Sequence, residues 1–295
     1  MGKIGIIGGS GLYEMEHLEA KKLKELKTPF GKPSDKFLLA KFEGAEVVFL
    51  SRHRWDHGIN PSQINYRANI YGMKSLGVDR IVSVTACGSL KEELKPLDFV
   101  IPDQFIDRTN QARKSTFFDE GVVAHINFAH PVCEELSKIV YECAKNTGVN
   151  VHFGGTYVNM EGPQFSTLAE SNLYRSLGLD IIGMTNMTEA RLAREAEICY
   201  TTLAAVTDYD CWHQVYKTVT VDIILDNLRK NIANAKKILN AVIPRLELRR
   251  NCGCRHALKH AIATNPKFVS KETKKKLDLL IGKYIKKEGM SESVE

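Results

Sequence analysis

Short apolar runs that end in small or polar residues recur along this chain and alternate with segments of helical spacing. The runs typical of strands cover residues 3–7, 47–50, 80–84, 99–102, 180–183 and 198–206, and an alternating stretch covers 150–160. Helices are expected over 65–76, 131–147, 188–196, 221–243 and 271–287. Because strands and helices are intermixed without a Ser/Pro-rich linker, the sequence predicts one α/β domain built around a central sheet flanked by helices.

The positive charge of the chain is concentrated in its last fifty residues. The 295 residues carry a formal net charge of +6, while residues 245–295 alone contain 13 Lys+Arg and 6 Asp+Glu. Residues 1–244 are therefore nearly neutral, which argues against a nucleic-acid partner. We divide the chain into a main domain, 1–245, and a basic, helical C-terminal extension, 246–295, that packs on the same domain.

No apolar stretch reaches the roughly 18 residues that a membrane span requires. The Gly-rich start after Lys3 also lacks the apolar core of a secretory signal. We therefore expect a cytoplasmic protein with no membrane partner.

Seven cysteines stand at irregular spacing, which is not typical of the disulfide framework of a secreted domain. Cys252-Gly253-Cys254 is followed by His256 and His260, and four soft ligands within nine residues resemble a zinc site. Paired zinc cysteines usually have two to four residues between them, however, and here there is one. Free thiols or a disulfide are therefore favoured, and no metal site is predicted.

Short segments that contain small or polar residues follow five of the predicted strands. They are Gly8-Gly9-Ser10, Ser51-Arg52-His53, Thr85-Ala86, Met184-Thr185 and Thr207-Asp208. In open α/β sheets, ligands bind beyond the carboxyl ends of the strands. Hydroxyls, a guanidinium, an imidazole and free backbone amides together suit a tetrahedral oxyanion such as phosphate.

The glycine-rich loop fits neither of two common nucleotide-binding motifs. A dinucleotide fingerprint needs a third glycine where Glu14 stands, and a P-loop needs a Gly-Lys-Ser/Thr that is missing. A turn that cradles phosphate is favoured over a plain tight turn. His53 and His57, four residues apart, would suit a metal on a helix, but Gly58 and Pro61 favour a loop with a histidine beside an anion.

Two acidic segments are candidates for binding a heterocycle. Asp208 and Asp210 lie two apart on extended chain, so they face the same way. They are either a surface or capping pair, or a pair that accepts from an amino group and presents a proton to a ring nitrogen. Phe165, in the turn that follows Glu161, either stacks on the ring or belongs to the core.

These motifs, in this order, resemble the trimeric nucleoside phosphorylase family. The matching segments are 8–12, 28–34, 52–53, 65–69, 85–89, 103–109, 161–163, 184–185 and 207–212, within a resemblance that covers about residues 3–245. The resemblance implies a twisted mixed sheet and a homo-trimer, or a homo-hexamer built from two trimers. It also implies a small-molecule nucleoside and inorganic phosphate as partners, with no metal or organic cofactor.

The resemblance also assigns roles to individual residues. Phosphate binding is implied for Ser10, Arg52, His53, Thr85, Ala86 and Thr185. Substrate binding is implied for Met184 along the ribose, for Asp208, Asp210 and Phe165 at the base, and for His125, which reaches the neighbouring subunit's pocket near the 5′ substituent. Asp208 is the expected catalytic acid, and Ser166 and Val221 match positions that shape the catalytic pocket.

The residue at position 208 separates two subclasses of that family. Relatives that act on 6-oxopurines carry Asn where Asp208 stands; an Asp accepts from a 6-amino group, whereas it would repel a 6-keto oxygen. The resemblance therefore favours phosphate-dependent cleavage of 5′-methylthioadenosine to adenine and 5-methylthioribose 1-phosphate, in purine and methionine salvage. The alternatives are a broad-specificity purine nucleoside phosphorylase acting on adenosine, inosine or guanosine, and a non-catalytic nucleotide- or anion-binding protein.

Overall fold

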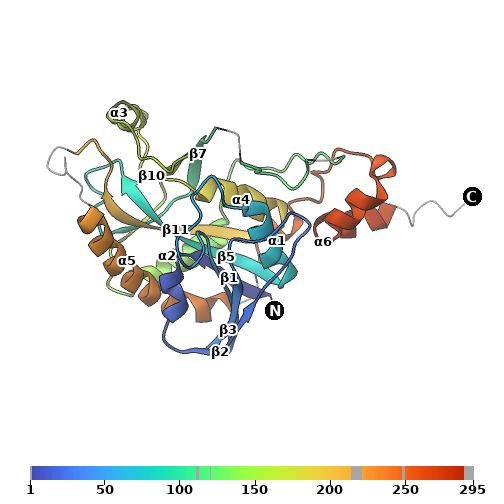
Figure 1. Ribbon diagram of the computed structural model, residues 1–295, viewed down its shortest axis with the longest axis horizontal. Coiled ribbons are helices and arrows are strands. Elements are labelled where there is room, and N and C mark those ends of the chain that lie inside the picture. The colour runs from blue at the N-terminus through green and yellow to red at the C-terminus, as the bar shows by residue number, and fades with distance from the viewer. Residues whose placement is uncertain (1, 111–112, 120, 214–220, 248–249, 289–295) are drawn as a thin grey trace, which may run out of the picture.

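The computed structural model describes residues 2–110, 113–119, 121–213, 221–247 and 250–288, and its centre is one mixed sheet of eleven strands (Figure 1). The strands are β1 Lys3–Gly8, β2 Leu18–Lys24, β3 Phe37–Phe42, β4 Ala45–Ser51, β5 Val78–Ser89, β6 Phe99–Ile101, β7 Gln104–Arg108, β8 Val151–Phe153, β9 Thr156–Met160, β10 Ile181–Gly183 and β11 Cys199–Tyr209. Their order is β2-β3-β4-β1-β5-β10-β9-β7, and β11 joins β5 to β6 and so to β8. The predicted α/β fold with a mixed sheet is confirmed.

Helices cover both faces of the sheet. They are α1 Tyr66–Ser75, α2 Glu134–Lys145, α3 Leu168–Ser176, α4 Asn186–Glu195, α5 Val221–Val242 and α6 Lys271–Glu288. Apolar side chains of α1 and α4 share one buried cluster, and those of α2 and α5 share a second cluster on the opposite face. Local capping fixes where several helices begin: Asn65 accepts from the amide of Ala68 in α1, and Thr167 and Glu170 form a capping box in α3.

The predicted strands and helices are present, with the stretch 150–160 divided into β8 and β9, but three described strands and one described α-helix were missed by the sequence analysis. Strand β2, of sequence LEAKKLK, is an exposed edge strand without an apolar run, and it is held by antiparallel pairing to β3. Strand β3, the short strand β7 and helix α3 were missed as well. Strand β7 depends on pairing with the distant strand β9, whereas β3 has an apolar run and α3 a capping box, local signals that the sequence analysis did not use.

Two central strands run further than predicted. β5 continues through Thr85 and Ala86 to Ser89, and β11 continues through Asp208 to Tyr209, because the two strands pair in parallel from Arg80–Cys199 to Ser89–Tyr209. The prediction that these strands end before their polar residues was wrong. A register shift between Val206 and Asp208 interrupts the ladder, and such a bulge re-aims the side chains that follow it.

The C-terminal extension packs against the α1–α4 face. Leu258 and, in α6, Leu277 and Ile281 are buried in the same cluster as residues of α1 and α4. The extension also pairs with an earlier loop, where Ala124 and Ile262 form an isolated bridge. Among the described helices, none is long and apolar enough to cross a membrane.

Candidate active site

A cavity of about 330 Å³ lies where β1, β5, β10 and β11 end. This volume is in the range of small-molecule sites. Except for Ser10, the predicted phosphate-binding residues line it, together with Phe165, Asp208 and Asp210 of the predicted base site. The full lining is Gly9, Arg52, His53, His57, Pro61, Val84, Thr85, Ala86, Cys87, Gly88, Met160, Phe165, Ile182, Gly183, Met184, Thr185, Thr207, Asp208, Asp210 and Leu228.

Arg52 is the buried cation of this cavity, with 3% of its surface exposed. It follows β4, and its backbone amide donates to the carbonyl of Gly8 at 2.9 Å, so the first two loops are tied together. Two of its nitrogens donate to the Glu189 carboxylate, Nε at 2.5 Å and Nη2 at 3.2 Å. Nη2 also donates to the Ser83 hydroxyl at 2.7 Å, and Nη1 donates to the Val84 carbonyl at 3.2 Å. A guanidinium has five N–H donors, so among the described residues one remains for a ligand.

Glu189 holds this arginine in place and was missed by the sequence analysis. It is 2% exposed and also accepts from Ser83 at 2.7 Å and from the Tyr200 hydroxyl at 2.9 Å. A buried carboxylate so paired fixes the orientation of Arg52, since breaking the pair would leave an uncompensated buried charge. The two residues are 137 positions apart, which is why spacing gave no signal.

His53 is a neutral imidazole beside the arginine. Burial, and then the positive charge of Arg52, lower the pKa of His53 to about 4. Its Nδ1 lies 2.8 Å from the Ile59 carbonyl, which only accepts, so Nδ1 carries the proton and Nε2 is an acceptor. His53 lies in a loop, as predicted, and its ring is stacked on that of His57, with centroids 6.0 Å apart.

Two threonines and a helix terminus complete the end of the cavity that is predicted to bind an anion. Thr185 is the N-cap residue of α4 and is buried, and its hydroxyl donates to Asn186 Oδ1 at 3.0 Å. Because the N-terminus of a helix carries partial positive charge, this position favours an anion. Thr85 lines the cavity from β5, next to the backbone of Ala86.

Asp208 and Asp210 form the opposite, acidic end of the cavity. Burial raises the pKa of Asp208 to about 6; a hydrogen bond from Thr207 at 2.6 Å opposes this and the charge of Asp210 adds to it. Asp210 is buried, and its Oδ2 accepts no hydrogen bond from any described residue. An unpaired buried acceptor costs free energy, so a ligand that donates a hydrogen bond there would be favoured.

Arg113 supports Met184, which lines the cavity, and was also missed by the sequence analysis. It is buried, and it donates to the Glu161 side chain at 3.1 Å, to the Glu161 carbonyl and to the carbonyl of Met184. Gly162 has a φ of +70°, and a Cβ there would stand 2.4 Å from the Met184 sulfur. The positive φ favours glycine at this turn, since the Met184 side chain could move but the backbone conformation would remain strained for other residues.

Three of the predicted site residues that the structure describes do not line this cavity. Ser10 faces a separate hollow beside Tyr13, although its neighbour Gly9 does line the cavity. Ser166 lies behind Met160, with its hydroxyl 3.8 Å from that sulfur. His125 lines a different cavity, and the side chain of Val221 lies outside the described residues. Phe165 lines the cavity but is 72% exposed, so it is not a core residue.

The fold and the cavity together define a protein that can bind an oxyanion and an amino-bearing ring side by side. The chain belongs to the phosphorylase superfamily, whose model matches residues 3–244.

Proteins that are similar in sequence and structure carry names that specify one activity within this superfamily. The S-methyl-5′-thioadenosine phosphorylase of Geobacter sulfurreducens is 56% identical over 96% of this chain and 99% of its own length. A crystal structure of a methylthioadenosine phosphorylase from an Antarctic soil metagenomic library has a TM-score of 0.91 and 48% identity, over 95% of this chain and 98% of that one. A mutant adenosine/methylthioadenosine phosphorylase of Schistosoma mansoni, in complex with adenine, has a TM-score of 0.82 and 37% identity, over 88% and 96% of the two chains.

Proposed function

We propose that this protein cleaves 5′-methylthioadenosine with inorganic phosphate and gives adenine and 5-methylthioribose 1-phosphate. The observation that carries the proposal is the unpaired, buried Oδ2 of Asp210 beside Asp208, in the same cavity as Arg52. The names of the relatives described above support the same substrate. The reaction belongs to purine and methionine salvage.

Phosphate binds at the end of the cavity that holds Arg52, Thr85 and Thr185. The remaining N–H of Arg52, the hydroxyls and the α4 terminus orient one phosphate oxygen toward C1′ of the ribose. His53, neutral in the free protein, accepts a hydrogen bond from a protonated phosphate oxygen. Inorganic phosphate is a co-substrate in this scheme, and the reaction uses no metal or organic cofactor.

Adenine leaves from the acidic end. As the C1′–N9 bond breaks, its electron pair moves into the purine, and protonated Asp208 gives its proton to N7 while the phosphate oxygen bonds to C1′. The raised pKa of Asp208 keeps a proton available close to neutral pH. The other oxygen of Asp208 accepts from the 6-amino group, which lies on the same edge of the purine as N7, and Asp210 accepts from it as well. Met184 lies along the ribose while Phe165 covers the base.

We propose that the functional unit is a cytoplasmic homo-trimer or homo-hexamer. Large apolar side chains in and around α3 are exposed in the single chain and would be covered in such an assembly: Phe165, Leu168, Leu173 and Leu177. His125 would then contribute to a neighbour's 5′ pocket, and Ser166 and Val221 would shape the same pocket. Light scattering coupled to size exclusion gives the mass of the assembly.

A substrate panel tests the proposed reaction. The full chain is incubated with methylthioadenosine, adenosine, inosine or guanosine, with phosphate and without it, and the free base and sugar 1-phosphate are measured. We expect adenine only in the presence of phosphate, with the highest kcat/KM for methylthioadenosine. Equal rates with inosine would indicate a broad purine nucleoside phosphorylase, and no base release with any nucleoside would indicate a binding protein.

A further inference from the structure

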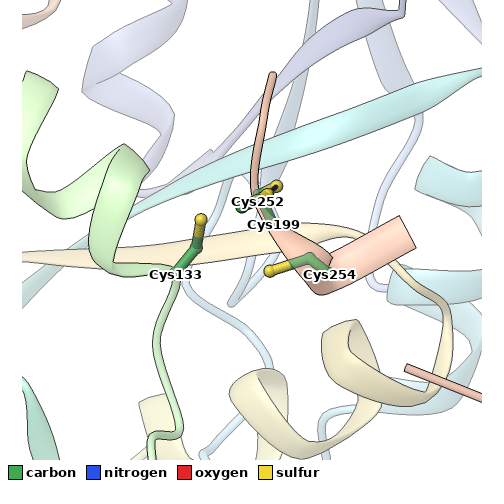
Figure 2. A group of neighbouring side chains, drawn as sticks. All are labelled: Cys133, Cys199, Cys252 and Cys254. Carbon is green, nitrogen blue, oxygen red and sulfur yellow. Dashed lines mark hydrogen bonds between the residues drawn. The ribbon is translucent and has the colours of Figure 1, made fainter. Parts of the chain in front are cut away.

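Four of the seven cysteines meet at one point on the far side of the molecule from the cavity just described. Cys133 is the N-cap residue of α2, Cys199 is the first residue of β11, and Cys252 and Cys254 belong to the start of the 3-10 turn η3 Gly253–His256 (Figure 2). Their sulfur atoms all lie within 4.8 Å of one another. Three segments that are distant in sequence thus converge on one cluster of thiols.

The spacing of the sulfurs suits a shared ion. The Sγ atoms of Cys199 and Cys252 are 3.2 Å apart, whereas a disulfide bond measures about 2.05 Å. All seven cysteines are free thiols, so the disulfide considered for Cys252 and Cys254 is not formed. In a tetrahedral zinc site each Zn–S distance is about 2.3 Å, which places the ligands about 3.8 Å apart.

The surroundings of the cluster also suit a metal held by thiolates. Cys133, Cys199 and Cys254 are buried and Cys252 is half-buried. An ion bound by these four sulfurs would therefore be enclosed by protein except on the side of Cys252. Arg250 lies with its Nη1 3.6 Å from the sulfur of Cys199 and offsets part of the charge of the four thiolates. The cluster borders a cavity of about 880 Å³ that gives an ion a path from solvent; its other lining includes Glu134, Glu135, His256 and His260.

We propose that Cys133, Cys199, Cys252 and Cys254 bind one Zn²⁺ that fastens the C-terminal extension to α2 and β11. Four sulfurs in a tetrahedral arrangement are typical of zinc or iron–sulfur sites, and a single ion accounts for four ligands around one point. On binding, each thiol releases its proton to solvent as its S–Zn bond forms. The Cys-x-Cys spacing argued against zinc in the sequence alone, but Cys133 and Cys199 supply the other pair.

The site is structural rather than catalytic. Cys199 begins β11 and Asp208 lies near the end of the same strand, nine residues later, which corresponds to about 30 Å. The metal therefore cannot reach the reacting atoms. It joins residues 252–254 to the N-terminal end of α2, and its loss should weaken the packing of the extension without altering the cavity.

Metal content of the full chain tests this proposal directly. Protein purified without chelator, and apo-protein reconstituted with Zn²⁺ under reducing conditions, should each hold one zinc per chain by plasma mass spectrometry, and X-ray absorption should show four sulfurs at about 2.3 Å. The double variant Cys252→Ser/Cys254→Ser should lose at least tenfold in zinc content. The matched control Cys143→Ser/Cys211→Ser, which changes two cysteines outside the cluster, should keep it.

A second measurement covers the case in which the cluster variant does not fold. Unmodified protein is treated with a mercurial reagent in the presence of a colorimetric zinc indicator, and it should release one equivalent. Three results would overturn the proposal. The four cysteines could resist alkylation until a reductant is added, which would show two disulfides. The purified protein could contain iron instead of zinc, or the four thiols could be free and take up no zinc. None of these readouts depends on phosphorolysis, so the proposal stands or fails apart from the proposed function.

Discussion

Replacement of Asp208 by Asn should make the protein more stable at neutral pH while it removes the catalytic acid. Burial raises the pKa of this carboxyl from its usual value of 3.8 to about 6. In the unfolded chain the group loses its proton near pH 4, so the folded state loses stability as the pH rises from about 4 to 6. A shift of about two pKa units, at about 1.4 kcal/mol each, corresponds to a cost of about 3 kcal/mol at pH 7.

The side chain of Asn keeps the geometry and removes the cost. Its carbonyl oxygen can still accept from Thr207, but it has no charge to bury. Solvent that enters the open cavity lowers the cost of burying the Asp208 charge, so we expect the free energy of unfolding of the Asn variant to be about 1–3 kcal/mol higher at pH 8. About half of that gain should be present at pH 5 and all of it by pH 7.

Urea unfolding at pH 5, 6 and 8, at one protein concentration and without phosphate or nucleoside, measures this difference. Asp226→Asn is the matched control, because Asp226 is exposed and its pKa is lowered by Lys230, 2.7 Å away. That variant should show no gain that grows with pH. A gain for Asp208→Asn that is the same at pH 5 and pH 8, or a loss at pH 8, would refute the assignment of a raised pKa to Asp208.

Four further results are expected. Asp208→Asn should also move the preference from adenosine toward inosine by at least tenfold in relative kcat/KM, because an amide can donate to a 6-keto oxygen; unchanged selectivity would contradict this. For the wild type, kcat/KM for the nucleoside should fall above about pH 6 as Asp208 loses its proton, and the Asn variant should lack that limb. Glu189→Gln should raise the phosphate KM about tenfold and lower the unfolding free energy by about 3 kcal/mol, whereas a purely structural Glu189 would leave the phosphate KM unchanged. Asp210→Ala should raise KM for methylthioadenosine about tenfold and leave the phosphate KM within twofold, and an equal rise in both would place Asp210 outside the base site.

The fold was predictable wherever a local pattern sufficed. The buried run of β1 and the capped helix α1 carry their own signals in apolar spacing and in Asn65. Strand β2 does not, because its side chains are mostly exposed and only its hydrogen bonds to β3 make it a strand. The lengths of β5 and β11 likewise depend on their mutual pairing, which a single run of sequence does not contain.

The candidate site was predictable in its ligand-facing residues and not in their supports. Arg52 and Asp208 follow apolar runs and belong to motifs, so sequence indicated both. Glu189 and Arg113 lie in segments that look like an ordinary helix and an ordinary loop, and only the fold brings them to Arg52 and to Glu161. The sequence did not predict the thiol cluster for the same reason, because Cys252 and Cys254 lie more than fifty residues after Cys199 in the chain.

A structure of the full chain with methylthioadenosine and sulfate tests the central claim, that one cavity holds an oxyanion and an aminopurine on opposite sides of a ribose. The geometry predicts the sulfate within hydrogen-bond distance of Arg52 and Thr185, and the adenine amino group and N7 facing Asp210 and Asp208. A sulfate remote from Arg52, or a nucleobase bound with Asp208 turned away from it, would contradict the proposed chemistry.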